Sequence, residues 1–66
     1  GTGVIVNGVA QRTTARTVWE LICQHSLEER RIVVELDGEI VVREEWSRTS
    51  IREGAAVELV HFVGGG

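Results

Sequence analysis

Apolar residues occur along this chain in short blocks that predict strands, with one longer block that predicts a helix. An apolar run at 4–6 is followed by Asn7-Gly8 and then by a strand-like segment at 9–12. Asn-Gly between β-formers predicts a tight hairpin, because both residues tolerate the positive φ angles of a type I′ turn. Residues 1–3 are expected to form a flexible start.

The helix is predicted to begin at Thr17. Thr17 and Glu20 have capping-box spacing, in which the Thr17 hydroxyl accepts the Glu20 backbone N–H and the Glu20 carboxylate accepts the Thr17 N–H. The following residues have the i, i+3, i+4, i+7 spacing of one buried helix face. These residues are Val18, Leu21, Ile22 and His25.

A second hairpin is predicted around Asp37-Gly38, which has the same turn chemistry as the first. Its strands are expected at 32–36 and 40–42. Between the helix and this hairpin, residues 26–31 lack apolar periodicity and predict a turn or a single helical turn.

Residues 43–46 lose β-composition and predict one short helical turn that lays the ring of Trp46 on the sheet. A connecting loop is expected at 48–53. Gly54 would then turn the chain into its last strand.

The last strand is predicted at 57–62 and runs without a turn into Gly64, Gly65 and Gly66. Residues 63–66 are therefore expected to protrude as a tail that ends in one carboxylate. Glycines have no Cβ, so such a tail can thread into a narrow channel. Taken alone, this ending is more typical of a frayed terminus or a cloning remnant, so the other elements decide its meaning.

The order of elements is two strands, a helix, two strands, a short turn and a last strand. One helix against a mixed sheet of four or five strands is a two-layer α+β domain. Residues 1–66 are expected to form one such domain, since a chain this short has room for only one small core.

Composition narrows the classes of function. The net charge of −3 and the pI near 5.2 argue against a nucleic-acid partner, which needs clustered cations, and favour a protein partner with a basic face. All seven basic residues are arginine. No apolar run is long enough to span a membrane, and the chain has a single cysteine, so we expect a soluble cytoplasmic protein without a membrane partner.

The metal-binding and nucleophilic candidates are weak. Cys23 and His25 are two residues apart on the predicted helix, where side chains diverge, and His61 lies far away in sequence. We therefore expect no metal site. Cys23 lacks a visible base and orienting group, so it is interpreted as a thiol of the core or its flank, and Trp19 and Trp46 as covers of the core.

With these elements placed, the sequence resembles the ThiS family of thiamin-biosynthesis sulfur carriers, which have the ubiquitin-like β-grasp fold. Four stretches carry the resemblance in the same order: VNG, TVWEL, LDGEIVVREEW and VELVHFVGGG. Each is weak alone, whereas their joint order, the chain length and the terminal glycines make a specific match.

The resemblance implies that the Gly66 carboxylate is adenylated by a ThiF-like activating enzyme that uses ATP and Mg. Sulfur derived from cysteine by a desulfurase would then convert it to a thiocarboxylate. A ThiG-like thiazole synthase would take that sulfur for the thiazole ring. The chain would be a carrier and not an enzyme, and would bind no cofactor itself.

A docking face follows from strand alternation. If Val57 and Leu59 point to the core, their neighbours point outward and lead to the tail, joined by Ile5 from the adjacent first strand of a β-grasp sheet. The opposite phase is the alternative. The predicted partner-binding residues are Ile5, Glu58, Val60, Phe62 and Val63.

Two other functions remain open. The small subunit of molybdopterin synthase uses the same terminal chemistry, although its members tend to be longer and to lack the segment LDGEIVVREEW. A non-covalent ubiquitin-like binding module with an inert tail is the other alternative. Deleting Gly65 and Gly66 would leave the activity of such a module unchanged.

Overall fold

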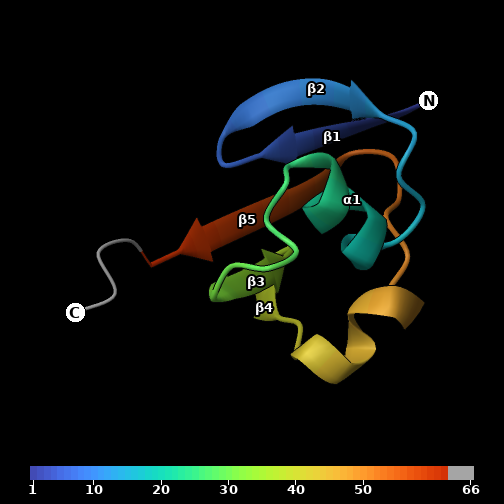
Figure 1. Cartoon of the computed structure of the whole chain (residues 1–66). Helices are drawn as coiled ribbons and strands as arrows, with labels where there is room; N and C mark the ends of the chain where they lie inside the picture. The colour runs from blue at the N-terminus through green and yellow to red at the C-terminus, as the bar shows by residue number, and fades with distance from the viewer. Residues whose placement is uncertain (63–66) are drawn as a thin grey trace.

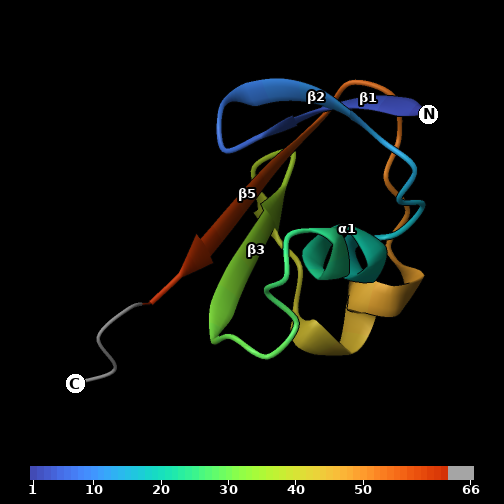
Figure 2. The same cartoon turned by 45° about the horizontal axis from the view of Figure 1, so that its top comes forward.

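The structure is a computed structural model and describes residues 1–62. Five strands form one sheet, and α1 and a 3-10 helix, η1, lie on the same side of it (Figures 1 and 2). This arrangement confirms the predicted α+β class and the mixed sheet. In chain order the elements are β1 (Thr2–Val6), β2 (Val9–Thr13), α1 (Val18–Gln24), β3 (Ile32–Leu36), β4 (Glu39–Ile40), η1 (Arg43–Arg48) and β5 (Ala55–His61).

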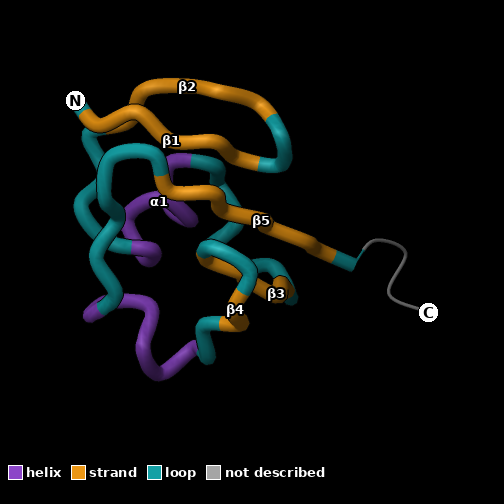
Figure 3. The backbone as a smooth tube through the Cα atoms, turned by 180° about the vertical axis from the view of Figure 1, so that it is seen from behind, coloured by secondary structure: helices purple, strands orange, loops and turns teal. Residues whose placement is uncertain are grey.

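The last strand, β5, is the centre of the sheet, whose order is β2-β1-β5-β3-β4. β5 runs parallel to β1, with Val57 beside Val6, and antiparallel to β3, with Val57 beside Leu36. The two hairpins, β1–β2 and β3–β4, therefore flank β5, and within residues 1–62 strand pairing joins them only through β5. Figure 3 shows β5 passing between the two hairpins toward the end of the chain.

Both predicted hairpin turns are confirmed. Asn7 and Gly8 have φ angles of 50° and 82°, and Asp37 and Gly38 have φ angles of 51° and 87°. Positive φ at both central positions is the type I′ requirement that Asn-Gly and Asp-Gly meet at low cost.

The expectation of a flexible start at residues 1–3 is wrong, because β1 already begins at Thr2. The Gly3 N–H donates to the Glu53 carboxylate at 3.0 Å, and the Gly54 N–H donates to the Gly3 carbonyl at 2.7 Å. These long-range bonds extend the strand beyond the apolar run that marked it in the sequence.

The predicted helix start is confirmed, but the capping box is only half formed. The Thr17 hydroxyl accepts the Glu20 N–H at 3.2 Å, whereas the Glu20 carboxylate accepts the N–H of Arg16, at 2.7 Å, and not that of Thr17. The chain before the helix is held extended, because Thr17 forms an isolated bridge with Ser50. This pairing brings the Arg16 N–H within reach of the carboxylate.

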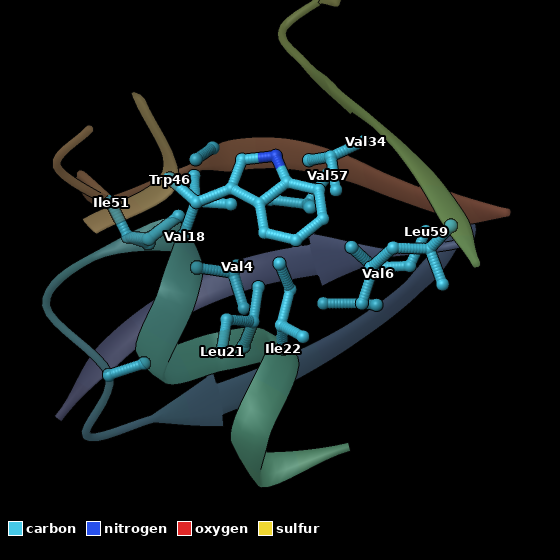
Figure 4. Close-up of a cluster of buried hydrophobic side chains, with 13 residues drawn as sticks. Val4, Val6, Val18, Leu21, Ile22, Val34, Trp46, Ile51, Val57 and Leu59 are labelled. Atoms are coloured by element: carbon cyan, nitrogen blue, oxygen red, sulfur yellow. The ribbon is translucent and has the colours of Figure 1, made fainter. Parts of the chain in front are cut away.

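The core lies between the sheet and the two helices. Val18, Leu21 and Ile22 are fully buried on α1, as predicted, and each contributes roughly 1.5–3 kcal/mol by leaving water. His25 is only partly buried and is the C-cap of α1, so it does not continue the stripe. Figure 4 shows the Trp46 ring lying among these side chains and those of the sheet.

The return strand of the second hairpin is shorter than predicted. It was expected at 40–42, but β4 covers only Glu39–Ile40. Val41 still donates its N–H to the Val34 carbonyl at 2.9 Å, while its own carbonyl accepts the indole N–H of Trp46 at 2.8 Å. Burial of Trp46 therefore turns the chain away from the sheet. The expected helical turn at 43–46 extends to Arg48.

Candidate docking site

The alternation predicted for β5 is confirmed. Val57 and Leu59 are 0% and 4% exposed and point to the core, whereas Glu58 is exposed and Val60 and Phe62 are 49% and 58% exposed. The strand and the residue after its end thus present two large apolar side chains, Val60 and Phe62, to solvent on the side away from α1. Phe62 is the last residue that the structure describes.

Strand pairing adds two apolar residues to the same side of the sheet. Ile5, 41% exposed, lies on β1 beside Ala56 of β5, and the half-buried Val33 lies on β3 opposite Val60. We call the side of the sheet opposite α1 the outer face. Its apolar patch, which consists of Ile5, Val33, Val60 and Phe62, is the kind of exposed surface that marks an interaction site.

A pair of carboxylates lies beside this patch. Glu35 on β3 is directly opposite Glu58 on β5. Like charges at such a position destabilise a sheet, so the pair favours a partner that places a cationic group between them. Glu58 was predicted from strand alternation, whereas Glu35 was not, because only the β3–β5 register places the two carboxylates together.

The root of the tail is supported on the β3 side. The Phe62 N–H donates to the Arg31 carbonyl at 3.3 Å, which continues the β3–β5 ladder by one residue beyond β5. The backbone that carries the outer-face aromatic ring is therefore fixed. Val63, Gly64, Gly65 and Gly66 lie outside the described residues, so the roles predicted for them stay predictions.

The residues considered for a metal site do not come together in the part of the chain that the structure describes. Within residues 1–62, no group of three or more His, Cys, Asp or Glu side chains could hold a metal ion. The His25 ring nitrogen Nδ1 instead lies 2.9 Å from the Leu21 carbonyl. Over the same residues, neither helix combines the length and the hydropathy needed to cross a membrane.

Cys23 is half-buried on α1, and its thiol pKa is raised above the ordinary value of 9.0. Partial burial is the main cause, followed by the negative charges of Glu28 and Glu20, and all three disfavour the thiolate. Because the thiolate is the nucleophile, Cys23 is poorly suited to attack an activated carbonyl or to hold sulfur as a persulfide.

We expect iodoacetamide to alkylate Cys23 several-fold more slowly in the folded chain than in the urea-unfolded chain at neutral pH. The rate in the folded chain should rise with pH to a midpoint above 9.0, because the shift is upward. Mass spectrometry of timed samples measures both rates. Equal rates in the two states would contradict this account of the thiol.

A family model for the ThiS family matches residues 4–66. The chain is 34% identical over 50 residues to the sulfur carrier protein ThiS of Bacillus subtilis, which covers 76% of each protein. It is also 30% identical over 64 residues to a thiazole synthase of Paramagnetospirillum magneticum. That match covers 96% of this chain and 20% of the other protein.

A solved structure agrees with these matches. The crystal structure of a thiamine biosynthesis protein (ThiS) from Geobacter metallireducens is 32% identical to this chain, with a TM-score of 0.81. The superposition covers 98% of this chain and all of that one. Sequence and fold thus agree with the resemblance found in the four sequence stretches, and the chain belongs to the ThiS family.

Proposed function

We propose that this chain is a sulfur carrier for the synthesis of the thiamin thiazole ring and holds the sulfur as a thiocarboxylate on Gly66. One observation carries the proposal. Val60 of the central strand β5, and Phe62 directly after this strand, are exposed on the outer face immediately before the VGGG ending. The relationship to a sulfur carrier protein and to a thiazole synthase supports the pathway.

The chemistry requires two steps at one carbonyl. A carboxylate is a poor electrophile, so a Gly66 oxygen first attacks the α-phosphorus of ATP, and pyrophosphate leaves. A sulfide nucleophile then adds to the carbonyl carbon of the acyl adenylate. The bond between this carbon and the phosphate oxygen breaks, and AMP leaves with the electron pair. Glycine leaves the path of attack open because it has no side chain.

The sequence contains no lysine, which suits a chain whose terminal carbonyl is activated, because a lysine amine is a nucleophile. All seven basic residues are arginine, so no lysine amine of this chain can compete with sulfur for the acyl adenylate. The guanidinium group stays protonated and is a poor nucleophile. The activated end is thereby protected from attack by the side-chain amines of neighbouring carriers.

In this proposal the catalytic groups belong to the partners. An ATP-using, ThiF-like enzyme covers the apolar patch of the outer face and places a cationic group near Glu35 and Glu58. A desulfurase supplies the sulfur from cysteine as a persulfide, which a thiol reductant converts to sulfide. A thiazole synthase accepts the sulfur from the thiocarboxylate afterwards. In this proposal the carrier acts in the cytoplasm, where ATP and reduced sulfur are both available.

Intact mass spectrometry tests the proposal. The chain is incubated with an activating enzyme, Mg-ATP and sulfide, beside a variant that lacks Gly65 and Gly66. We expect the full chain to gain the mass of one oxygen replaced by one sulfur, and the shortened chain to gain nothing. A Cys23→Ala variant should gain the same mass as the wild type, which locates the sulfur away from the thiol.

The activating enzyme must first be shown to convert another carrier protein to its thiocarboxylate. If the full chain then gains no sulfur with this enzyme, the result contradicts the proposal and favours a binding module with an inert tail. A gain of sulfur leaves the recipient to be identified. Transfer to a thiazole synthase supports the thiamin pathway, whereas transfer only to the large subunit of molybdopterin synthase would overturn it.

A further inference from the structure

β5 is longer than β1, its parallel neighbour in the sheet, and extends beyond the end of β1. On the β1 side, strand pairing ends where Val6 lies beside Val57, and the Asn7 N–H then donates to the Val57 carbonyl at 2.9 Å. Here the chain turns back into β2, while β5 continues to His61. Without another contact, the end of β5 that leads to the tail would be held only by β3.

The Asn7 side chain supplies that contact. Its Oδ1 accepts the Leu59 N–H at 2.8 Å, and its Nδ2 donates to the Leu59 carbonyl at 3.2 Å. A side-chain amide thus occupies the place of the next peptide group of β1. It extends the β1–β5 ladder from Val57 to Leu59, close to the docking residue Val60.

Two requirements meet at this position. The backbone of Asn7 needs a positive φ, here 50°, which asparagine tolerates better than most residues. The side chain must also offer one donor and one acceptor, which asparagine does and aspartate, when ionised, does not. The turn alone would accept either residue, whereas the contact with Leu59 requires the amide.

We propose that Asn7 is a positioning residue for the tail, an inference that rests on the proposed function. By tying the end of β1 to Leu59, it fixes Val60 and Phe62 relative to Ile5 on the outer face. It thereby fixes the position of Phe62, the last described residue, from which the Gly66 carboxylate must reach the ATP of a partner enzyme that covers the patch.

The second hairpin offers a matched control. Asp37 has the same place in its turn and a φ of 51°. Its Oδ1 accepts the Ala56 N–H at 2.9 Å, and its N–H donates to the Ala56 carbonyl at 2.8 Å. The Asp37 side chain therefore also holds β5, through one hydrogen bond where Asn7 makes two, and it does so near the beginning of the strand, at Ala56.

The experiment compares Asn7→Gly with Asp37→Gly. Glycine accepts the positive φ, so each variant removes the side-chain contact without straining the turn. We expect both to lower the melting temperature. Below that temperature, we expect Asn7→Gly to lower kcat for sulfur incorporation about tenfold, because misplacement of a reacting group slows the reaction. We expect Asp37→Gly to leave kcat near the wild-type value.

The loss should appear in kcat because saturation with carrier restores docking but not the alignment of the carboxylate. Asn7→Asp, which keeps the acceptor and loses the donor, should have an intermediate kcat. Hydrogen exchange should accelerate at the Leu59 amide in Asn7→Gly and not in Asp37→Gly. That readout reports the contact itself, independently of the enzyme.

The outcomes separate the two hypotheses. A wild-type chain that gains no sulfur contradicts the proposed function and this inference with it. A wild-type chain that gains sulfur, together with equal kcat values for Asn7→Gly and Asp37→Gly, contradicts the inference alone. Unchanged exchange at Leu59 in Asn7→Gly also overturns it, because the contact would then not hold the strand.

Discussion

Replacing Phe62 with aspartate will raise the KM of the activating enzyme for this carrier by about 30-fold and leave the fold intact. Phe62 is 58% exposed and contributes little to the packing of the core, so its loss lowers the free energy of unfolding of the free protein only slightly. In a complex, however, a central aromatic residue contributes about 2 kcal/mol or more, and each 1.4 kcal/mol is tenfold in affinity. Steady-state rates of pyrophosphate release measure the change.

Val9→Asp is the matched control. Val9 is 62% exposed, close to the value for Phe62. It lies on β2 opposite Val6, whose side chain points to the core, and is therefore on the other side of the sheet from the apolar patch. We expect its KM to equal that of the wild type. If Phe62→Asp unfolds the chain, or if both variants raise KM equally, Phe62 is not a specific docking residue.

Replacing Trp46 with alanine will leave much of the protein unfolded at physiological temperature. Trp46 is 4% exposed, donates its indole N–H to Val41, and stacks on Trp19 with ring centroids 6.4 Å apart. Removing a buried tryptophan costs about 3–5 kcal/mol. A domain of 66 residues has a total stability of only about 3–10 kcal/mol.

Two further variants separate the contributions of this ring. Trp46→Phe keeps an aromatic ring but leaves the Val41 carbonyl unpaired, which costs about 1–3 kcal/mol. Trp19→Ala should cost less than Trp46→Ala, since Trp19 is 37% exposed. Urea unfolding followed by circular dichroism measures all three. A Trp46→Ala variant as stable as Trp19→Ala would show that the core does not depend on Trp46.

The features predicted correctly from the sequence are those that neighbouring residues determine. Asn7-Gly8 and Asp37-Gly38 specify their turns through their own φ preferences. The helix start depends on Thr17 and on the spacing of the apolar residues that follow it. Strand alternation then gave the correct phase for β5, so the exposure of Val60 and Phe62 was predicted as well.

The features that were missed or wrong depend on which strands lie side by side. The Glu35–Glu58 pair, the contact of Asn7 with Leu59 and the extension of β1 to Thr2 all join residues far apart in sequence. The early end of β4 has the same origin, because it follows from the bond between Trp46 and Val41. Local propensity contains no information about such registers.

The central place of β5 also determines how this protein folds. Each hairpin is closed by a two-residue turn and can form within microseconds, but the β1–β5 pairing closes a loop of about fifty residues, as between Val4 and Ala55. Until β5 inserts, the two hairpins share no strand pairing. We therefore expect the core and the outer face to form together in one late step, so that a partner enzyme meets either a complete docking face or none.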